Sequence, residues 1–93
     1  MDDLIKRVGV YAGVPVSDMK TRRGGRKTSR ARQAFMYLSR HVLGETDSDI
    51  ALFLGCSQQN ISYQITGVEH DMRIYYSVRN MIDDIRSELE KKA

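Results

Sequence analysis

Residues 47–66 read DSDIALFLGCSQQNISYQIT and contain two helical patterns separated by a glycine. Ala51 stands four residues before Gly55, and Ile61 stands six residues after it, which is the spacing of a helix-turn-helix. Ala51 is small enough for a second helix to cross close to the first, and Gly55 can adopt the left-handed backbone of the tight turn. The residues expected to pack the two helices together are Ile50, Leu54, Ile61 and Ile65.

The second helix of this pair is predicted to begin at Ser57 and to carry uncharged polar side chains on its outer face. Glutamine can pair bidentately with adenine, and serine and threonine can serve several bases, so this composition suits the major groove. An ordinary solvent-facing helix is the alternative, but it is expected to use Lys and Glu rather than two adjacent glutamines and a tyrosine. The predicted base-reading residues are Ser57, Gln58, Gln59, Ser62, Tyr63 and Thr66.

The basic residues are concentrated in one segment. The chain has a net charge of +3, but residues 20–40 hold eight basic residues and no acid, and the rest of the chain has a net charge of −5. Such a segment is expected of a polyanion binder, because neutralising phosphates releases counterions. A solvated charge run without function is the alternative. The basic residues predicted to contact phosphate or the minor groove are Arg22, Arg23, Arg26, Lys27, Arg30 and Arg32.

The rest of the chain shows helical rather than strand periodicity, so we predict an all-α bundle of five or six helices. Leu4, Val8 and Tyr11 lie on one face of a first helix that ends near Gly13 and Pro15. The segments expected next are a short helix capped by Ser17 or Asp18, an extended basic loop over residues 20–27, and a helix with Ser29 as its N-cap that ends at Gly44.

The C-terminal part of the chain is predicted to form one more helix. We expect a break near Gly67 and a last helix from about Asp71 to the end. The apolar stripe expected on this last helix consists of Ile74, Val78, Met81, Ile82, Ile85 and Leu89.

A chain of 93 residues has room for one modest core, so we predict a single domain over residues 1–93. The single cysteine, Cys56, excludes an internal disulfide and is expected to pack in the core. The N-terminus is unlike a signal peptide, and no apolar run reaches the roughly 20 residues of a membrane span. We therefore expect a cytoplasmic protein without a membrane partner.

Catalytic and metal-binding patterns are not suggested by the sequence. His41 and His70 have no partners at ligand spacing. No glycine-rich phosphate loop follows a strand, and no set of Ser, His and an acid is suggested beyond chance. We expect no enzyme activity, no cofactor, no metal site and no small-molecule substrate.

Two other groups of residues suggest alternative partners. Tyr63, Tyr75 and Tyr76 can stack on unpaired bases, which would favour single-stranded nucleic acid or RNA. Core packing is the expected role of Tyr75, however. The last helix also carries acidic residues that form a solvated face or dock a protein partner, and these are Asp83, Asp84, Glu88 and Glu90.

Residues 16–40 read VSDMKTRRGGRKTSRARQAFMYLSR, and residues 3–16 read DLIKRVGVYAGVPV. The first stretch resembles the basic loop and the following Arg-Gln helix of the C-terminal DNA-binding domain of the bacterial replication initiator DnaA. The second is similar to the helix that leads into that loop, and the closing helix resembles the family's last one. The resemblance thus covers practically the whole chain and leaves no room for the family's ATPase module.

This resemblance implies roles for individual residues. It implies that Arg32 and Gln33 hold phosphate near the N-terminus of their helix, a role that exposed, donor-rich side chains suit. It also implies that the basic loop inserts an arginine into the minor groove. An ungapped comparison puts the family's arginine at Gly24, which leaves Arg23 or Arg26 as the substitute.

The recognition helix departs from the family. The family signature Gly-Gly-Arg-Asp-His-Thr-Thr corresponds, with a one-residue slip, to GCSQQNI at residues 55–61. We therefore expect binding to double-stranded DNA at a site unlike the DnaA box, in replication-origin binding or transcription regulation, with replication or transcription proteins as further partners. The alternative is an adaptor, such as an anti-initiator, that keeps the fold and binds protein without reading DNA.

Overall fold

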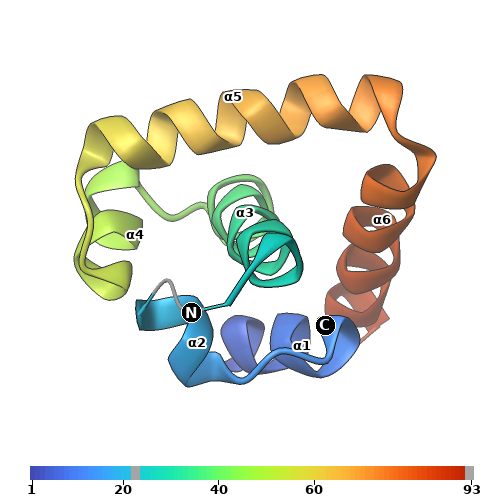
Figure 1. Cartoon of the computed structure of the whole chain (residues 1–93), viewed down its shortest axis with the longest axis horizontal. Helices are drawn as coiled ribbons and strands as arrows, with labels where there is room; N and C mark the ends of the chain where they lie inside the picture. Colours follow the sequence, from blue (N-terminus) through green and yellow to red (C-terminus); the bar gives the residue numbers. More distant parts are fainter. Residues whose placement is uncertain (22–23, 92–93) are drawn as a thin grey trace.

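The computed structural model describes residues 1–21 and 24–91, and within them it contains six α-helices and no strand. The helices are α1 (Asp2–Ala12), α2 (Val16–Thr21), α3 (Arg26–His41), α4 (Asp47–Leu54), α5 (Gln58–Ile74) and α6 (Tyr76–Lys91). Figure 1 shows α5 on one side of the molecule, α1 on the opposite side and α3 between them. The predicted all-α bundle is confirmed. None of these six helices is long and apolar enough to cross a membrane.

Helix α3 is the centre of the fold, because each of the other five helices packs against it. Ala31, Ala34, Phe35 and Leu38 lie at helical spacing on one face of α3 and are buried, and Val42 directly after the helix is partly buried. Met36 and Ser39 are buried as well, so α3 is covered on more than one side. Its first turn is different, because Arg26 and Lys27 there are exposed. The central helix therefore reaches the surface mainly through its basic N-terminal end.

The helix-turn-helix formed by α4 and α5 is confirmed. Thr46 caps α4 by accepting a hydrogen bond from the backbone N–H of Asp49 at 3.1 Å, and Ser57 caps α5 by accepting one from Asn60 at 3.1 Å. Gly55, between the helices, has φ +69°, a backbone conformation that favours glycine. The predicted contact between the two helices is buried at Ile50, Leu54, Ile61 and Ile65.

The predicted cap of α2 is wrong. The helix begins at Val16, so Ser17 and Asp18 lie inside its first turn rather than before it. The backbone carbonyl of Pro15 accepts a hydrogen bond from the N–H of Asp18 at 3.1 Å. Pro15 stands just before the helix, where its missing N–H removes no hydrogen bond of the helix.

The predicted start of α3 is also wrong, and the basic loop is shorter than expected. The helix begins at Arg26, and the N–H of Ser29 donates to the carbonyl of Gly25 at 3.1 Å, so Ser29 is a helical residue and not the N-cap. Residues 20–21 belong to α2, and residues 22–23 lie outside the described residues. Thr28 is buried, and such tertiary packing stabilises a helix more than local propensity does.

The break predicted near Gly67 is wrong, because α5 continues through it to Ile74. A glycine in a helix costs about 1 kcal/mol relative to alanine. The neighbouring Ile65 and Val68 are buried, and their packing outweighs that cost. The chain bends instead at Tyr75, whose backbone has φ −108° and ψ 114°. We call residues 74–76 the elbow.

The stripe predicted for the last helix is correct in part. Val78, Ile82 and Ile85 are buried on α6, and Met81 and Leu89 are partly buried against the core. Ile74 is 58% exposed and Tyr75 is 49% exposed, so the core packing predicted for these two residues is wrong. Both belong to the elbow, where the backbone turns away from the helical repeat.

Candidate nucleic-acid interface

The six residues predicted to read bases lie at the start of α5 and along its exposed side. Ser57 is the N-cap, and Gln58 and Gln59 form the first turn, which contains no acidic residue. All six are exposed, as expected from the inward orientation of Ile61 and Ile65. Among them, Tyr63 is a large side chain of which 76% is exposed.

Hydrogen bonds within α5 occupy some of these residues. Besides the Ser57 cap, the hydroxyl of Thr66 donates to the backbone carbonyl of Ser62 at 3.0 Å. The side-chain amides of Gln58 and Gln59 make no hydrogen bond to any residue in the ranges 1–21 and 24–91. An amide offers both donors and an acceptor, so these two glutamines have the most hydrogen-bonding capacity left for base edges.

The start of α3 is an electropositive helix end. Its N-cap is Gly25, which has no side chain to accept from the first N–H groups, and its first turn contains no acid. Arg26 and Lys27 add two exposed cations, and no ion pair among the described residues neutralises them. A phosphate group at this end would supply both the missing acceptors and the negative charge.

Arg32 and Gln33 are less accessible than the family resemblance implies. Arg32 is only 8% exposed, so its predicted exposure is wrong. Gln33 is half-buried, and its Nε2 donates a hydrogen bond to Oε1 of Gln64 at 2.8 Å. The physical reason is the central position of α3, which leaves few positions beyond its first turn in contact with solvent. The amide of Gln33 joins α3 to α5.

Gln64 is a residue that sequence reasoning missed at this surface. It stands three residues after Ile61 and one before Ile65, so helical spacing places it beside the apolar stripe and facing α3. A cavity of about 50 Å³ lies there, between the start of α3 and the middle of α5. The residues that line it are Ser29, Arg32, Gln33, Met36 and Gln64.

The other basic residues within the range 20–40 differ in their surroundings, and Arg40 lies 3.7 Å from Asp47. Arg22 and Arg23 lie outside the described residues. Arg30 is half-buried, and its guanidinium carbon lies 5.7 Å from the centre of the Tyr75 ring. The Nζ of Lys20 lies 4.5 Å from the centre of the Phe53 ring, which joins α2 to α4. Two cations of the basic segment are thus held by aromatic rings of other helices or of the elbow.

Groups with other chemistry do not converge on a site. His41 lies 3.5 Å from Glu69, and His70 lies 3.8 Å from Asp71. No group of three or more His, Cys, Asp or Glu residues suited to a metal ion occurs in the part of the chain that the structure describes. Cys56 is partly buried against the core, in agreement with its predicted packing role.

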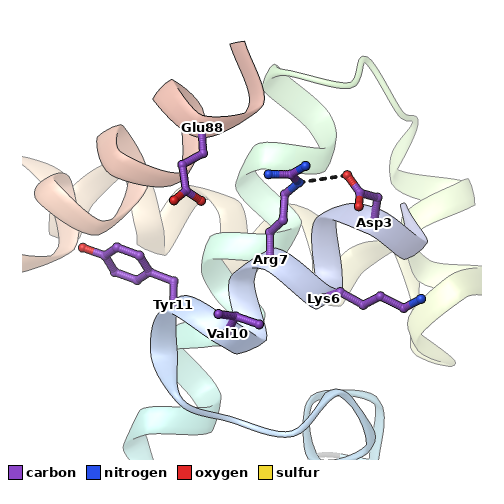
Figure 2. Close-up of a pocket in the computed structure, with 6 residues that line it drawn as sticks. All are labelled: Asp3, Lys6, Arg7, Val10, Tyr11 and Glu88. Atoms are coloured by element: carbon purple, nitrogen blue, oxygen red, sulfur yellow. Dashed lines mark hydrogen bonds and ion pairs between the residues drawn. The ribbon is translucent and has the colours of Figure 1, made fainter. Parts of the chain in front are cut away.

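A pocket of about 450 Å³ lies between α1 and α6, and Figure 2 shows the residues that line it. Its side chains carry charges of both signs, and Arg7 pairs with Asp3 at 2.8 Å. Helix α1 lies on the opposite side of α3 from α5, so this pocket is separate from the exposed side of α5. The lining residues are Asp3, Lys6, Arg7, Val10, Tyr11 and Glu88.

A protein-family model described as the bacterial DnaA protein helix-turn-helix matches residues 1–67. The matched range includes the basic segment, α4 and the N-terminal part of α5, whereas the elbow and α6 lie beyond it. No curated protein matches the chain. The matched range contains the helix-turn-helix described above and covers most of the chain. The chain therefore belongs to the bacterial DnaA helix-turn-helix family, a family of DNA-binding domains.

Proposed function

We propose that the chain binds double-stranded DNA with a sequence preference, as one domain over residues 1–93. The observation that carries this proposal is the row of exposed, uncharged polar residues on α5, which packs against α3, the helix with an electropositive start. Gln58 and Gln59 lie against base edges in the major groove, and Arg26 and Lys27 lie against phosphates.

The other predicted residues complete this proposed surface. Ser57, Ser62, Tyr63 and Thr66 extend the reading row along α5. The basic segment adds the minor-groove contact, through Arg23 or through Arg26 at the start of α3. The hydrogen bond between Gln33 and Gln64 supports a single surface, because it holds the edge of α3 against the recognition helix. The further residues proposed to contact the backbone are Arg22, Arg30, Arg32 and Gln33.

The positions of the tyrosines favour a duplex over a single strand as the partner. Tyr63 lies in the N-terminal half of α5, and Tyr75 lies beyond the other end of that helix. Twelve helical residues at 1.5 Å each separate their backbones by about 18 Å. This distance separates Tyr63 from the adjacent Tyr75 and Tyr76, so the three rings do not form one continuous stacking row.

The proposed binding serves replication-origin recognition or transcription regulation, with replication or transcription proteins as further partners. A DNA partner and the single cysteine support the expected cytoplasmic location. The second candidate is a protein-binding adaptor. The pocket between α1 and α6 favours it, because Val10 there is 85% exposed next to charges of both signs.

Selection from a random pool of duplexes, followed by titration of the selected and scrambled duplexes, tests this proposal. We expect enrichment of a site that differs from the DnaA box and that binds more tightly than its scrambled form. We also expect affinity to fall steeply with salt, with a slope of about −0.9 for each phosphate contacted. A pool without enrichment, combined with weak binding that salt does not change, contradicts DNA binding and supports the adaptor.

A further inference from the structure

The elbow between α5 and α6 exposes three large side chains in succession. Ile74 is 58% exposed, Tyr75 is 49% exposed and Tyr76 is 77% exposed. Of the three, Tyr75 is the one whose ring lies against a charged residue of another element, because the guanidinium of Arg30 lies over it. That contact joins the elbow to the basic N-terminal part of α3.

The backbone of Tyr75 is held on both sides, although its side chain is half-exposed. Its N–H donates to the carbonyl of Asp71 at 2.7 Å, and its carbonyl accepts from the N–H of Arg79 at 3.3 Å. The residue thus closes α5 and opens α6. Val68 and Val78 anchor these two helices in the core. The ring therefore projects from a fixed point and not from a flexible loop.

The contact with Arg30 suits the binding of phosphate. The guanidinium carbon lies 5.7 Å from the ring centre, within the range of about 6 Å for a cation–π interaction. A guanidinium that rests on a ring keeps its edge N–H groups for a two-oxygen acceptor such as phosphate. Arg30 takes part in none of the ion pairs among residues 1–21 and 24–91, so no acid there competes for these donors.

Two other cation–π contacts differ from that of Arg30 and Tyr75 in the burial of the ring. Lys20 lies over Phe53, and Arg86 lies over Tyr37 at 6.0 Å. Phe53 and Tyr37 are partly buried and pack against the core, so their rings are needed for the fold in any case. Tyr75 is more exposed and is not part of that core, and its ring lies against the guanidinium of Arg30.

We propose that Tyr75 is a positioning residue for Arg30, and that the phosphate-binding surface extends through this pair from the start of α3 to the elbow. The inference rests on the proposed DNA binding, and it adds a residue beyond the helix-turn-helix to that interface. The ring restricts the long Arg30 side chain before DNA arrives, so less side-chain freedom is lost when the guanidinium contacts a phosphate.

A double-mutant cycle on duplex affinity tests this inference. The variants are Tyr75→Leu, Arg30→Ala and their combination, with Tyr75→Phe as the conservative variant and Tyr76→Leu as the matched control. All are titrated with the selected duplex and its scrambled form over a range of salt concentrations. Thermal unfolding by circular dichroism verifies that each is folded at the titration temperature, and Tyr75→Gln replaces Tyr75→Leu in the cycle if the leucine variant is not.

We expect Tyr75→Leu to weaken binding to both duplexes by about 2–5-fold, the loss that corresponds to one exposed cation–π contact. Tyr75→Phe and Tyr76→Leu should bind like the parent, because the interaction uses the ring and not the hydroxyl. Arg30→Ala should lower the magnitude of the salt slope by about 0.9. In the Arg30→Ala background, Tyr75→Leu should have no further effect.

The inference is overturned if Tyr75→Leu lowers the duplex affinity equally in the parent and in the Arg30→Ala background. It is also overturned if Tyr76→Leu lowers the affinity as much as Tyr75→Leu does. If the parent binds the duplex in a salt-dependent way and Tyr75→Leu binds it as tightly as the parent does, this inference is overturned and the proposed function is not. A parent that shows no such binding overturns the proposed function, and this inference with it.

Discussion

Gln33 on α3 donates a hydrogen bond from its Nε2 to Oε1 of Gln64 on α5 at a distance of 2.8 Å. Both side chains are half-buried, so the bond is partly shielded from water. It connects α3, which begins with the exposed cations Arg26 and Lys27, to α5, which carries the row of exposed polar residues. Gln58 and Gln59 are not involved, and their amides stay on the outer side of α5.

A double-mutant cycle should show that Gln33 and Gln64 are energetically coupled. Its variants are Gln33→Leu, Gln64→Leu and their combination. Each single change leaves one half-buried amide without this partner, whereas the double change removes both amides. We expect a coupling of about 0.5–1.5 kcal/mol in the free energy of unfolding. Urea denaturation measures it, with Gln58→Leu as an exposed control on the same helix. Additive single effects would contradict a bond that contributes to stability.

Alanine at Gln58 or Gln59 should relax the preference for one base pair. A bidentate contact between glutamine and adenine discriminates by about 1–3 kcal/mol, so the loss should be about tenfold or more at an A·T pair under α5. The measurement is a titration of each variant against every single-base change of the selected site, with circular dichroism to verify folding. If both variants keep the full preference of the parent, specificity comes from the basic loop or from DNA shape instead.

Alanine at Arg26 or Lys27 should weaken binding to all sequences about equally, because phosphate contacts carry no direct sequence information. Each change should also lower the magnitude of the salt slope by about 0.9. Lys91→Ala is the control, since it removes the same charge from the end of α6 that lies opposite the elbow. Arg32 is less suitable for this test, because it is buried and its substitution would also change the stability of the fold. A slope that falls equally in the control would show that only net charge matters.

Alanine at two helical glycines should change stability in opposite directions. At Gly9 an added Cβ would lie 2.7 Å from the backbone carbonyl oxygen of Val14, so we expect a loss of about 1–3 kcal/mol. At Gly67 nothing lies within 4 Å of an added Cβ, and the helix should gain about 0.5–1 kcal/mol. Urea denaturation of both variants provides the comparison. A stabilised Gly9→Ala would disprove the close approach of α1 to Val14.

Phenylalanine at Tyr11 should remove a stabilisation that depends on pH. The Tyr11 hydroxyl donates to Oδ2 of Asp84 at 2.7 Å. That hydrogen bond, partial burial and the charges of Asp84 and Glu88 raise the pKa of Tyr11 above its usual value. The protonated phenol is favoured in the folded state, so the stabilisation is complete below the unfolded pKa of about 10 and disappears as pH rises through the raised folded pKa.

At pH 7 the Tyr11→Phe variant should be less stable by about 0.5–1 kcal/mol, a small loss because the bond is exposed. The difference from the parent should shrink as pH rises above about 10. Urea denaturation between neutral and alkaline pH measures it, with Tyr76→Phe as the control without this bond. A difference that stays constant over the whole pH range would argue against a role for the Asp84 contact.

Local spacing determined the helix-turn-helix, and this part could be predicted from the sequence. Ala51, Gly55 and Ile61 lie within eleven residues, and a small residue, a left-handed turn and an inward apolar residue each act on their immediate neighbours. The same holds for the caps at Thr46 and Ser57, whose hydroxyls bond to N–H groups three residues away. The outward orientation of the polar row on α5 followed from the same local periodicity.

Tertiary packing decided the rest. Gly67 continues α5 because its neighbours are buried, and Arg32 is covered because the other helices surround α3. Gln33 meets Gln64 across 31 positions of the chain, and Arg30 on α3 meets Tyr75 in the elbow. A periodic pattern specifies which face of a helix is apolar, but it does not specify which helix covers that face. The partners of half-buried polar side chains therefore become defined only when the six helices are packed together.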